Sequence, residues 1–144
     1  MKKGYKNVYW FKGGISEWRR FDYPLHVDKK YENYRPVKLS PKKIMVLLKQ
    51  QNVFVLDVRP QNFAKGPKFI AGAYHCPLLN IIERLSELPK DRPMVISDWA
   101  MRQSPLAAKY LMANGFTNIV GVVKGGIGRW VHDGLPTEER IVTH

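Results

Sequence analysis

The chain has 144 residues, 44% hydrophobic and 25% charged, which is the size and composition of one globular domain with a real core. No stretch approaches the roughly 18 consecutive apolar residues of a membrane span. The single cysteine, Cys76, excludes an internal disulfide. No Cys/His cluster has zinc spacing, and no metal or cofactor is expected. The net charge is +12, and residues 1–43 hold twelve Lys/Arg against four Asp/Glu.

The basic first part of the chain has two interpretations. A basic surface attracts nucleic acid, anionic lipid or an acidic partner. Because the cations are scattered and form no basic block, we favour a solvated linker and expect no nucleic-acid binding. An anionic ligand or acidic partner is the alternative. No apolar segment follows the basic start as it would in a secretory signal, which favours a cytoplasmic location, although the compartment stays undetermined if the parent protein begins further upstream.

A short internal repeat links the two ends of the chain. Its matching pieces, in one order and with rare residues, are residues 4–8 and 115–119, residues 12–15 and 124–127, Trp18 and Trp130, and Pro24 and Pro136. The second copy ends a complete α/β pattern, whereas the first begins the chain. We therefore interpret residues 1–25 as the tail of a preceding, similar domain in a tandem protein. Residues 8–11 are then expected to be disordered or to pair at a sheet edge.

The rest of the chain alternates strands and helices. The sequence predicts a linker over residues 26–39 and a domain over residues 40–140. Within the domain it predicts a helix from Pro41 capped by Ser40, a buried strand at 53–58, a loop at 59–72, a short strand at 73–76, a helix at 78–88, a buried strand at 93–97, a turn at 98–103, a helix capped by Ser104 and ending near 114, a strand at 119–123 and a short helix at 127–131.

Such alternation indicates a mostly parallel sheet with helices on both faces, a three-layer α/β/α fold. In sheets of this kind, ligands lie beyond the carboxyl ends of the strands. The loops that follow Asp57 and Ser97 are therefore the places where a functional site is expected.

Four motifs in chain order resemble one family, the rhodanese-like domains. They are VLDVRP at residues 55–60, FIAGA at 69–73 followed by Pro77, LAAKYL with a later Gly-Phe at 106–116, and VKGGI with a later Trp at 123–130. The resemblance covers roughly residues 40–137 and implies the rhodanese-like α/β fold. Combined with the repeat, it identifies the chain as the second copy of a tandem rhodanese protein.

The resemblance also locates a departure from the family. The family's active loop, Cys-x-x-Gly-x-Arg-Ser, aligns here with Asp98, Trp99, Ala100, Met101, Arg102, Gln103 and Ser104. Asp98 therefore occupies the position of the nucleophilic cysteine, Met101 that of the glycine and Gln103 that of the arginine. Phosphatase chemistry, which needs a cysteine and an arginine six positions later, is excluded because position 104 is a serine.

The family's loop favours an anion, because its backbone N–H groups point inward at the positive end of a helix. A carboxylate suits such a cradle but cannot carry a persulfide sulfur. We therefore predict a degenerate loop with no catalytic residue. Two alternatives for single residues stay open: Asp98 caps the helix or faces solvent, and Arg102 either binds an anion or points away.

Asp57, Arg59 and Cys76 complete the predicted site, and Trp99 of the loop has two possible roles. Asp57 and Arg59 are assigned a scaffolding role, as a buried carboxylate tied to backbone or to the arginine, by resemblance to the family. Cys76 is the alternative nucleophile, but a cysteine at the end of a buried strand is usually a small apolar core residue. Trp99 is either a partner contact or a cover over the pocket.

Two functions follow as hypotheses. In the first, the chain is not an enzyme but a structural or regulatory module that works beside an active rhodanese domain of its parent protein. In the second, it is a sulfurtransferase that uses Cys76 or a thiol supplied by a partner domain.

Overall fold

The computed structural model describes residue 4, residues 6–61 and residues 68–140. The chain divides into two compact units, Met1–Glu32 and Asn33–His144, and each unit is described by itself. None of the described helices is long and apolar enough to cross a membrane.

The larger unit is built on a five-stranded parallel sheet. Its strands, in spatial order, are β1 (Lys38–Leu39), β6 (Ile119–Val123), β5 (Met94–Ser97), β2 (Phe54–Asp57) and β4 (Tyr74–His75). This confirms the predicted fold class. The prediction of a linker through residue 39 is wrong at its end, because Lys38 and Leu39 pair with Val122 and Val123 and so form an edge strand of the sheet.

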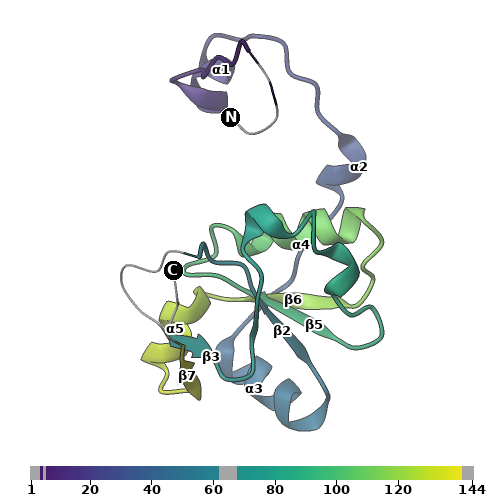
Figure 1. Ribbon diagram of the computed structural model, residues 1–144, viewed down its shortest axis with the longest axis vertical. Helices are drawn as coiled ribbons and strands as arrows, with labels where there is room; N and C mark the ends of the chain where they lie inside the picture. Colours follow the sequence, from purple (N-terminus) through teal and green to yellow (C-terminus); the bar gives the residue numbers. More distant parts are fainter. Residues whose placement is uncertain (1–3, 5, 62–67, 141–144) are drawn as a thin grey trace. The chain divides into compact units, whose positions relative to one another are not determined.

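Helices cover both faces of the sheet. Helix α4 (Ser104–Ala113) lies on one face, and α3 (Pro41–Gln50) and α5 (Gly126–His132) lie on the other (Figure 1). Successive strand residues point to opposite faces, so Leu56 and Ile96 pack in the core with α4, whereas Val55 and Val95 pack in the core with α3 and α5. Burial of each such side chain stabilises the fold by about 1.5–3 kcal/mol. Because both faces of β2 and β5 are covered, their sequences are continuous apolar runs, as is typical of central parallel strands.

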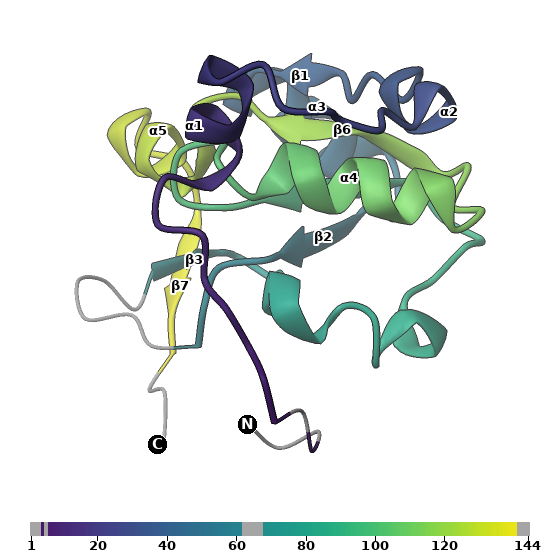
Figure 2. The ribbon, with the colours of Figure 1, turned by 90° about the horizontal axis from the view of Figure 1, so that it is seen from above.

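A second, small sheet lies beside α5 (Figure 2). In it, β3 (Lys68–Ile70) pairs antiparallel with β7 (Thr137–Glu139). The sequence predicted a loop over residues 59–72, and this prediction is wrong for residues 68–70. Phe69 and Ile70 are buried, and Ile70 belongs to the core that α3 and α5 cover.

One helix prediction is confirmed and two differ from the structure. The cap of α3 is confirmed, since the Ser40 hydroxyl oxygen accepts the Lys43 N–H and Pro41 stands at the first helical position. In α4, however, Gln103 is the capping residue and Ser104 is the first helical residue. Residues 78–88 form two 3₁₀ helices, η1 (Leu78–Asn80) and η2 (Leu85–Glu87), and not one continuous helix. A segment this short is marginal as a helix, and here the buried Ile81 and Leu88 determine its course.

The smaller unit contains α1 (Gly14–Arg20) and α2 (Lys29–Glu32). Residues 8–11 form neither helix nor strand, and their side chains are exposed, so the predicted pairing at a sheet edge is not present. The four residues of α2 fall inside the predicted linker.

Helix α1 reproduces the local structure of α5 at an offset of 112 residues. Trp18 Nε1 donates to the Pro24 carbonyl at 3.0 Å, and Trp130 Nε1 donates to the Pro136 carbonyl at 2.8 Å. Backbone bonds match as well: the N–H five residues after each tryptophan donates to that tryptophan's carbonyl. Burial differs sharply, since Trp130 is fully buried whereas the residues of α1 are not.

Candidate functional site

The carboxylate of Asp98 lies at the centre of the loop that links β5 to α4. Its side chain is buried, with a relative exposure of 1%. Oδ1 accepts the Met101 N–H at 2.6 Å and the Ser104 hydroxyl at 3.1 Å, while Oδ2 accepts the N–H groups of Gln103 and Ser104 at 2.5 and 3.1 Å. The loop therefore folds around a single anionic side chain, and the solvent-facing alternative for Asp98 does not hold.

Two of these donors, the N–H groups of Gln103 and Ser104, are backbone amides at the start of α4, and a third, that of Met101, belongs to the loop. Such amides have no partner inside the helix and carry the positive end of its dipole. A carboxylate is the natural acceptor for them, and bonds between a charged group and an N–H contribute about 1.5–3 kcal/mol each. Asp98 therefore holds the loop closed as well as capping α4.

The backbone of the loop is strained at Met101, which has a φ of +64°. This left-handed conformation is ordinary for glycine and costs other residues about 1–2 kcal/mol. The side chain of Met101 is half-buried and packs against the core beneath α4, which offsets part of that cost. Ala100 and Arg102 are exposed, whereas the Asp98 carboxylate is buried.

Helix α5 approaches the loop closely. The Ile127 N–H donates to the Asp98 carbonyl at 2.8 Å, and a Cβ on Gly126 would lie 2.5 Å from the carbonyl oxygens of both Asp98 and Trp99. Only glycine fits at position 126, where φ is +60°. The VKGGI motif marks the glycine pair, but no local pattern in the sequence indicates this close approach of Gly126 to the loop.

A buried ion pair lies at the end of β2, the strand that neighbours β5. Arg59 and Asp57 are 1% and 0% exposed, and Arg59 Nη2 lies 2.8 Å from Asp57 Oδ2. Asp57 also accepts the Arg59 backbone N–H, and Arg59 Nη2 donates to the Lys68 carbonyl. Asp57 is the direct strand partner of Ser97, the residue before Asp98. The pair thus links β2 to β3, next to the strand that the loop follows.

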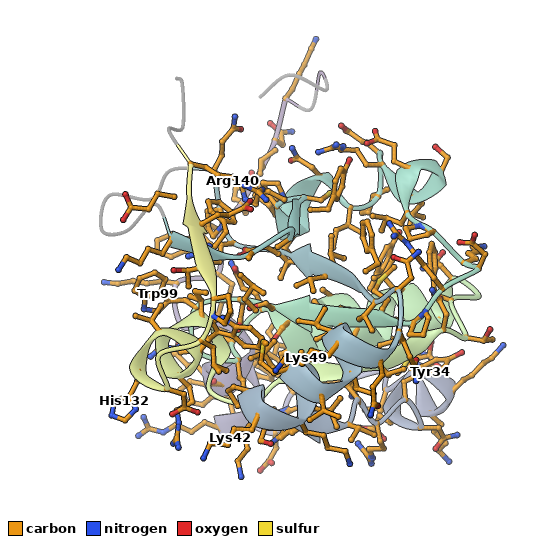
Figure 3. All side chains as sticks on the ribbon, turned by 90° about the horizontal axis from the view of Figure 1, so that it is seen from below. Tyr34, Lys42, Lys49, Trp99, His132 and Arg140 are labelled. Carbon is orange, nitrogen blue, oxygen red and sulfur yellow. The ribbon has the colours of Figure 1, made fainter. Side chains whose placement is uncertain are left out.

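Trp99 lies next to this ion pair. The guanidinium carbon of Arg59 lies 5.7 Å from the centre of the Trp99 ring, and Trp99 is half-exposed at the periphery of the molecule, as Figure 3 shows. One face of the indole therefore contacts a buried cation while part of the ring faces solvent. This geometry is compatible with both predicted roles of Trp99.

Cys76 is a residue of the hydrophobic core. Its side chain is fully buried in the core beneath α4, where burial raises the pKa of the thiol. The neighbouring His75 does not activate it: His75 Nε2 lies 2.8 Å from the Arg59 carbonyl oxygen, and its ring packs on Phe69. Cys76 thus has the environment of a core residue.

Two pockets flank the loop, and Asp98 lines neither. One, of about 350 Å³, is lined by Pro60, Gln61, Pro77, Leu78, Leu79, Asn80 and Gln103. The other, of about 500 Å³, is lined by Ser40, Pro41, Lys42, Met101, Lys124, Gly125, Arg129 and Asp133. No cluster of three or more His, Cys, Asp or Glu side chains suited to a metal occurs among the described residues.

Comparisons with known proteins agree with this architecture. Residues 40–133 match a family model described as "Rhodanese-like domain". The chain is 37% identical over 87 residues to a protein named "Sulfurtransferase" from Allochromatium vinosum, covering 60% of this chain and 78% of that one. It is 30% identical over 94 residues to "Thiosulfate sulfurtransferase GlpE" of Pseudomonas putida, covering 65% and 83%.

Solved structures show the same fold. A rhodanese-like domain from Anabaena superposes with a TM-score of 0.63 at 26% identity, covering 75% of this chain and 82% of that one. A rhodanese-related protein from Thermoplasma volcanium superposes with a TM-score of 0.59 at 24% identity, covering 73% and 98%.

Proposed function

The chain belongs to the rhodanese-like family, and from that premise we propose that it is a non-catalytic member in which a carboxylate replaces the sulfur-carrying thiol. The observation that supports this most directly is the environment of Asp98. Its two oxygens accept four hydrogen bonds, and 1% of the residue is exposed. The cradle that would hold a persulfide anion is filled by the protein's own side chain.

The chemistry explains why this substitution abolishes transfer. In the family's reaction, a thiolate attacks the sulfane sulfur of a donor such as thiosulfate, the donor's S–S bond breaks and sulfite leaves, and the persulfide so formed later passes its outer sulfur to an acceptor and returns to the thiolate. A carboxylate oxygen forms no stable equivalent of the persulfide. Access is also lost, since the carboxylate is buried and both of its oxygens already accept hydrogen bonds, so that it presents almost no surface to a sulfur donor.

The role proposed for the chain is structural or regulatory, beside an active rhodanese domain in a tandem protein. The repeat supports this. Helix α1 has the local structure of α5, yet Ile15 is 57% exposed where its counterpart Ile127 is 1% exposed. Tyr9 and Trp10 are 91% and 84% exposed. A segment with the sequence and hydrogen bonds of a buried closing helix, but with its apolar side chains exposed, fits the tail of a second domain of the same fold.

A second function has one observation in its favour. The relatives named above are called sulfurtransferases, and Cys76 is the chain's own thiol. Against it stand the complete burial of Cys76 and the raised pKa of its thiol, since the thiolate and not the thiol is the nucleophile.

Mass spectrometry of the intact protein after incubation with thiosulfate separates the two functions. The non-catalytic function predicts that the mass does not change. A mass gain of one sulfur atom on the wild type that is absent from Cys76→Ala would support the second function instead.

A further inference from the structure

The larger of the two pockets carries a surplus of positive charge that the proposed function does not use. We call it the basic pocket; it is the one lined by Ser40, Pro41, Lys42, Met101, Lys124, Gly125, Arg129 and Asp133. Four segments that are distant in sequence form it: the start of α3, the loop before α4, the turn after β6 and helix α5. Because β1 and β6 are parallel neighbours, their carboxyl ends bring Ser40 and Lys124 to the same edge of the sheet.

The charges in the basic pocket do not balance. Three lining side chains are cationic and one is a carboxylate. Arg129 Nε binds Asp133 Oδ1 at 2.7 Å, and this pair neutralises itself. Lys42 and Lys124, two further lining residues, provide the remaining charge. Figure 3 shows Lys42 at the end of α3 that lies beside α5, whereas Lys49 lies further along the same helix. Two lysines at one pocket repel each other unless an anion lies between them.

The backbone adds to this field. Helix α3 has ten residues and begins at the basic pocket, so the positive end of its dipole lies there. Gly125 has a φ of +79°, and a Cβ at that position would lie 2.6 Å from the Cβ of Arg129. Only glycine therefore allows the backbone of this turn to lie so close to the side chain of Arg129.

The lining also has an apolar part. Pro41 is buried, and Met101 is half-buried and shared with the active-loop region. A volume of about 500 Å³ exceeds that of a lone oxyanion and matches the pockets that hold small organic ligands. The two surplus charges match a dianion better than a singly charged carboxylate.

From these features we propose that the basic pocket binds a small organic phosphate, with the phosphate between Lys42 and Lys124 and the organic part against Pro41 and Met101. This site is separate from the Asp98 cradle and does not depend on whether the chain transfers sulfur. A ligand in the basic pocket would nevertheless contact the loop, because Met101 lines the pocket. The N–H of the same residue donates to Asp98.

The test is a two-dimensional amide NMR titration of the full chain with phenyl phosphate. We expect saturable shifts at the amides of Lys42, Met101 and Gly125, with benzoate binding at least about tenfold more weakly because it has a single charge. Lys42→Met and Lys124→Met should each weaken binding about fivefold, since an exposed charge pair contributes little more than that. The matched control is Lys49→Met, which removes an exposed lysine of α3 outside the pocket and should leave affinity unchanged.

Any of four results would overturn the proposal. One is the absence of saturation at millimolar phenyl phosphate. Another is equal binding by the wild type and both pocket variants, or shifts confined to residues 1–32, which would indicate nonspecific attraction to the basic chain. The last is an affinity for inorganic phosphate as high as for phenyl phosphate, which would contradict the apolar half of the site. All three lysines are exposed, and thermal unfolding of each variant will verify that the fold is retained.

Discussion

Asp98, the first residue of the loop between β5 and α4, is joined twice to Ser104, the first residue of α4: the Ser104 hydroxyl donates to Oδ1 of Asp98, and the Ser104 N–H donates to Oδ2, both at 3.1 Å. The two bonds close the loop into a ring around one carboxylate. The loop therefore depends on its own internal anion for its shape.

Replacing Asp98 with asparagine should destabilise the domain strongly. The amide nitrogen would face N–H donors that now bind a carboxylate oxygen, leaving buried donors without an acceptor. We expect a loss of about 2–4 kcal/mol in the free energy of unfolding, measured by urea denaturation. Asp91→Asn, at an exposed position, is the control and should change stability by less than about 0.5 kcal/mol. Equal small effects from both would show that the loop does not rely on Asp98.

Replacing Asp98 with cysteine should create a reactive thiol. In a Cys76→Ala background, the new thiolate would accept N–H bonds from Met101, Gln103 and Ser104, which favour the anion. Its alkylation by iodoacetamide should therefore have a pH midpoint below the ordinary thiol value of about 8.5. Asp91→Cys in the same background should give the ordinary value. A midpoint at or above 8.5 for the loop cysteine would contradict the assignment of an anion-stabilising cradle.

Gly126 and Gly128 provide a matched pair on α5. A methyl group at Gly126 would lie 2.5 Å from two loop carbonyl oxygens, in a backbone conformation with positive φ, whereas at Gly128 its nearest contact would be an ordinary 3.5 Å. Gly126→Ala should cost more than about 2 kcal/mol of unfolding free energy. Gly128→Ala should be neutral or stabilising, because alanine is the better helix residue. The melting temperature of Gly126→Ala should lie well below that of Gly128→Ala. The reverse order would contradict the close approach of Gly126 to the loop.

The equivalent tryptophans of the repeat should differ in importance. Trp130 is fully buried, so Trp130→Ala should cost about 3–5 kcal/mol or prevent folding of the larger unit. Trp18→Ala should leave the unfolding of that unit within about 0.5 kcal/mol of the wild type. If Trp18→Ala were as damaging as Trp130→Ala, α1 would have a buried partner within this chain and the tandem proposal would lose its support.

Glu87 should give the domain a stabilising contribution that depends on pH. Hydrogen bonds from Arg84, with a further one from Tyr74, lower the pKa of its carboxyl to about 2, whereas an unfolded glutamate titrates near 4.3. A depressed pKa stabilises the fold above the unfolded pKa, and this stabilisation is lost as the pH falls toward 2. Wild type should therefore exceed Glu87→Gln in stability at pH 7 and match it near pH 2. A difference that stays constant across this range would exclude the ionised carboxylate as its source.

Much of the architecture could be predicted from local patterns. The continuous apolar runs at β2 and β5 predicted central parallel strands, and the Ser-Pro pair before α3 predicted its start, because each depends on neighbouring residues alone. The family resemblance is confirmed, and it directed attention to Asp98 before any coordinates.

The missed features depend on contacts between distant segments. Strand β3 has three residues and forms only by pairing with β7, which lies some seventy residues later, so no local pattern marked it. The same holds for β1: its local sequence predicts a linker, and it is a strand only because it pairs with β6. At the site, the close approach of Gly126 to the loop and the left-handed backbone of Met101 follow from packing between distant segments. The sequence shows only that methionine stands where the family's loop has glycine.

The most direct measurement is thiocyanate formation from thiosulfate and cyanide by the purified wild-type chain, beside Cys76→Ala. The account predicts that neither protein exceeds the rate of the protein-free reaction, because Asp98 fills the cradle and Cys76 is buried in the core. Turnover by the wild type that disappears in Cys76→Ala would contradict it.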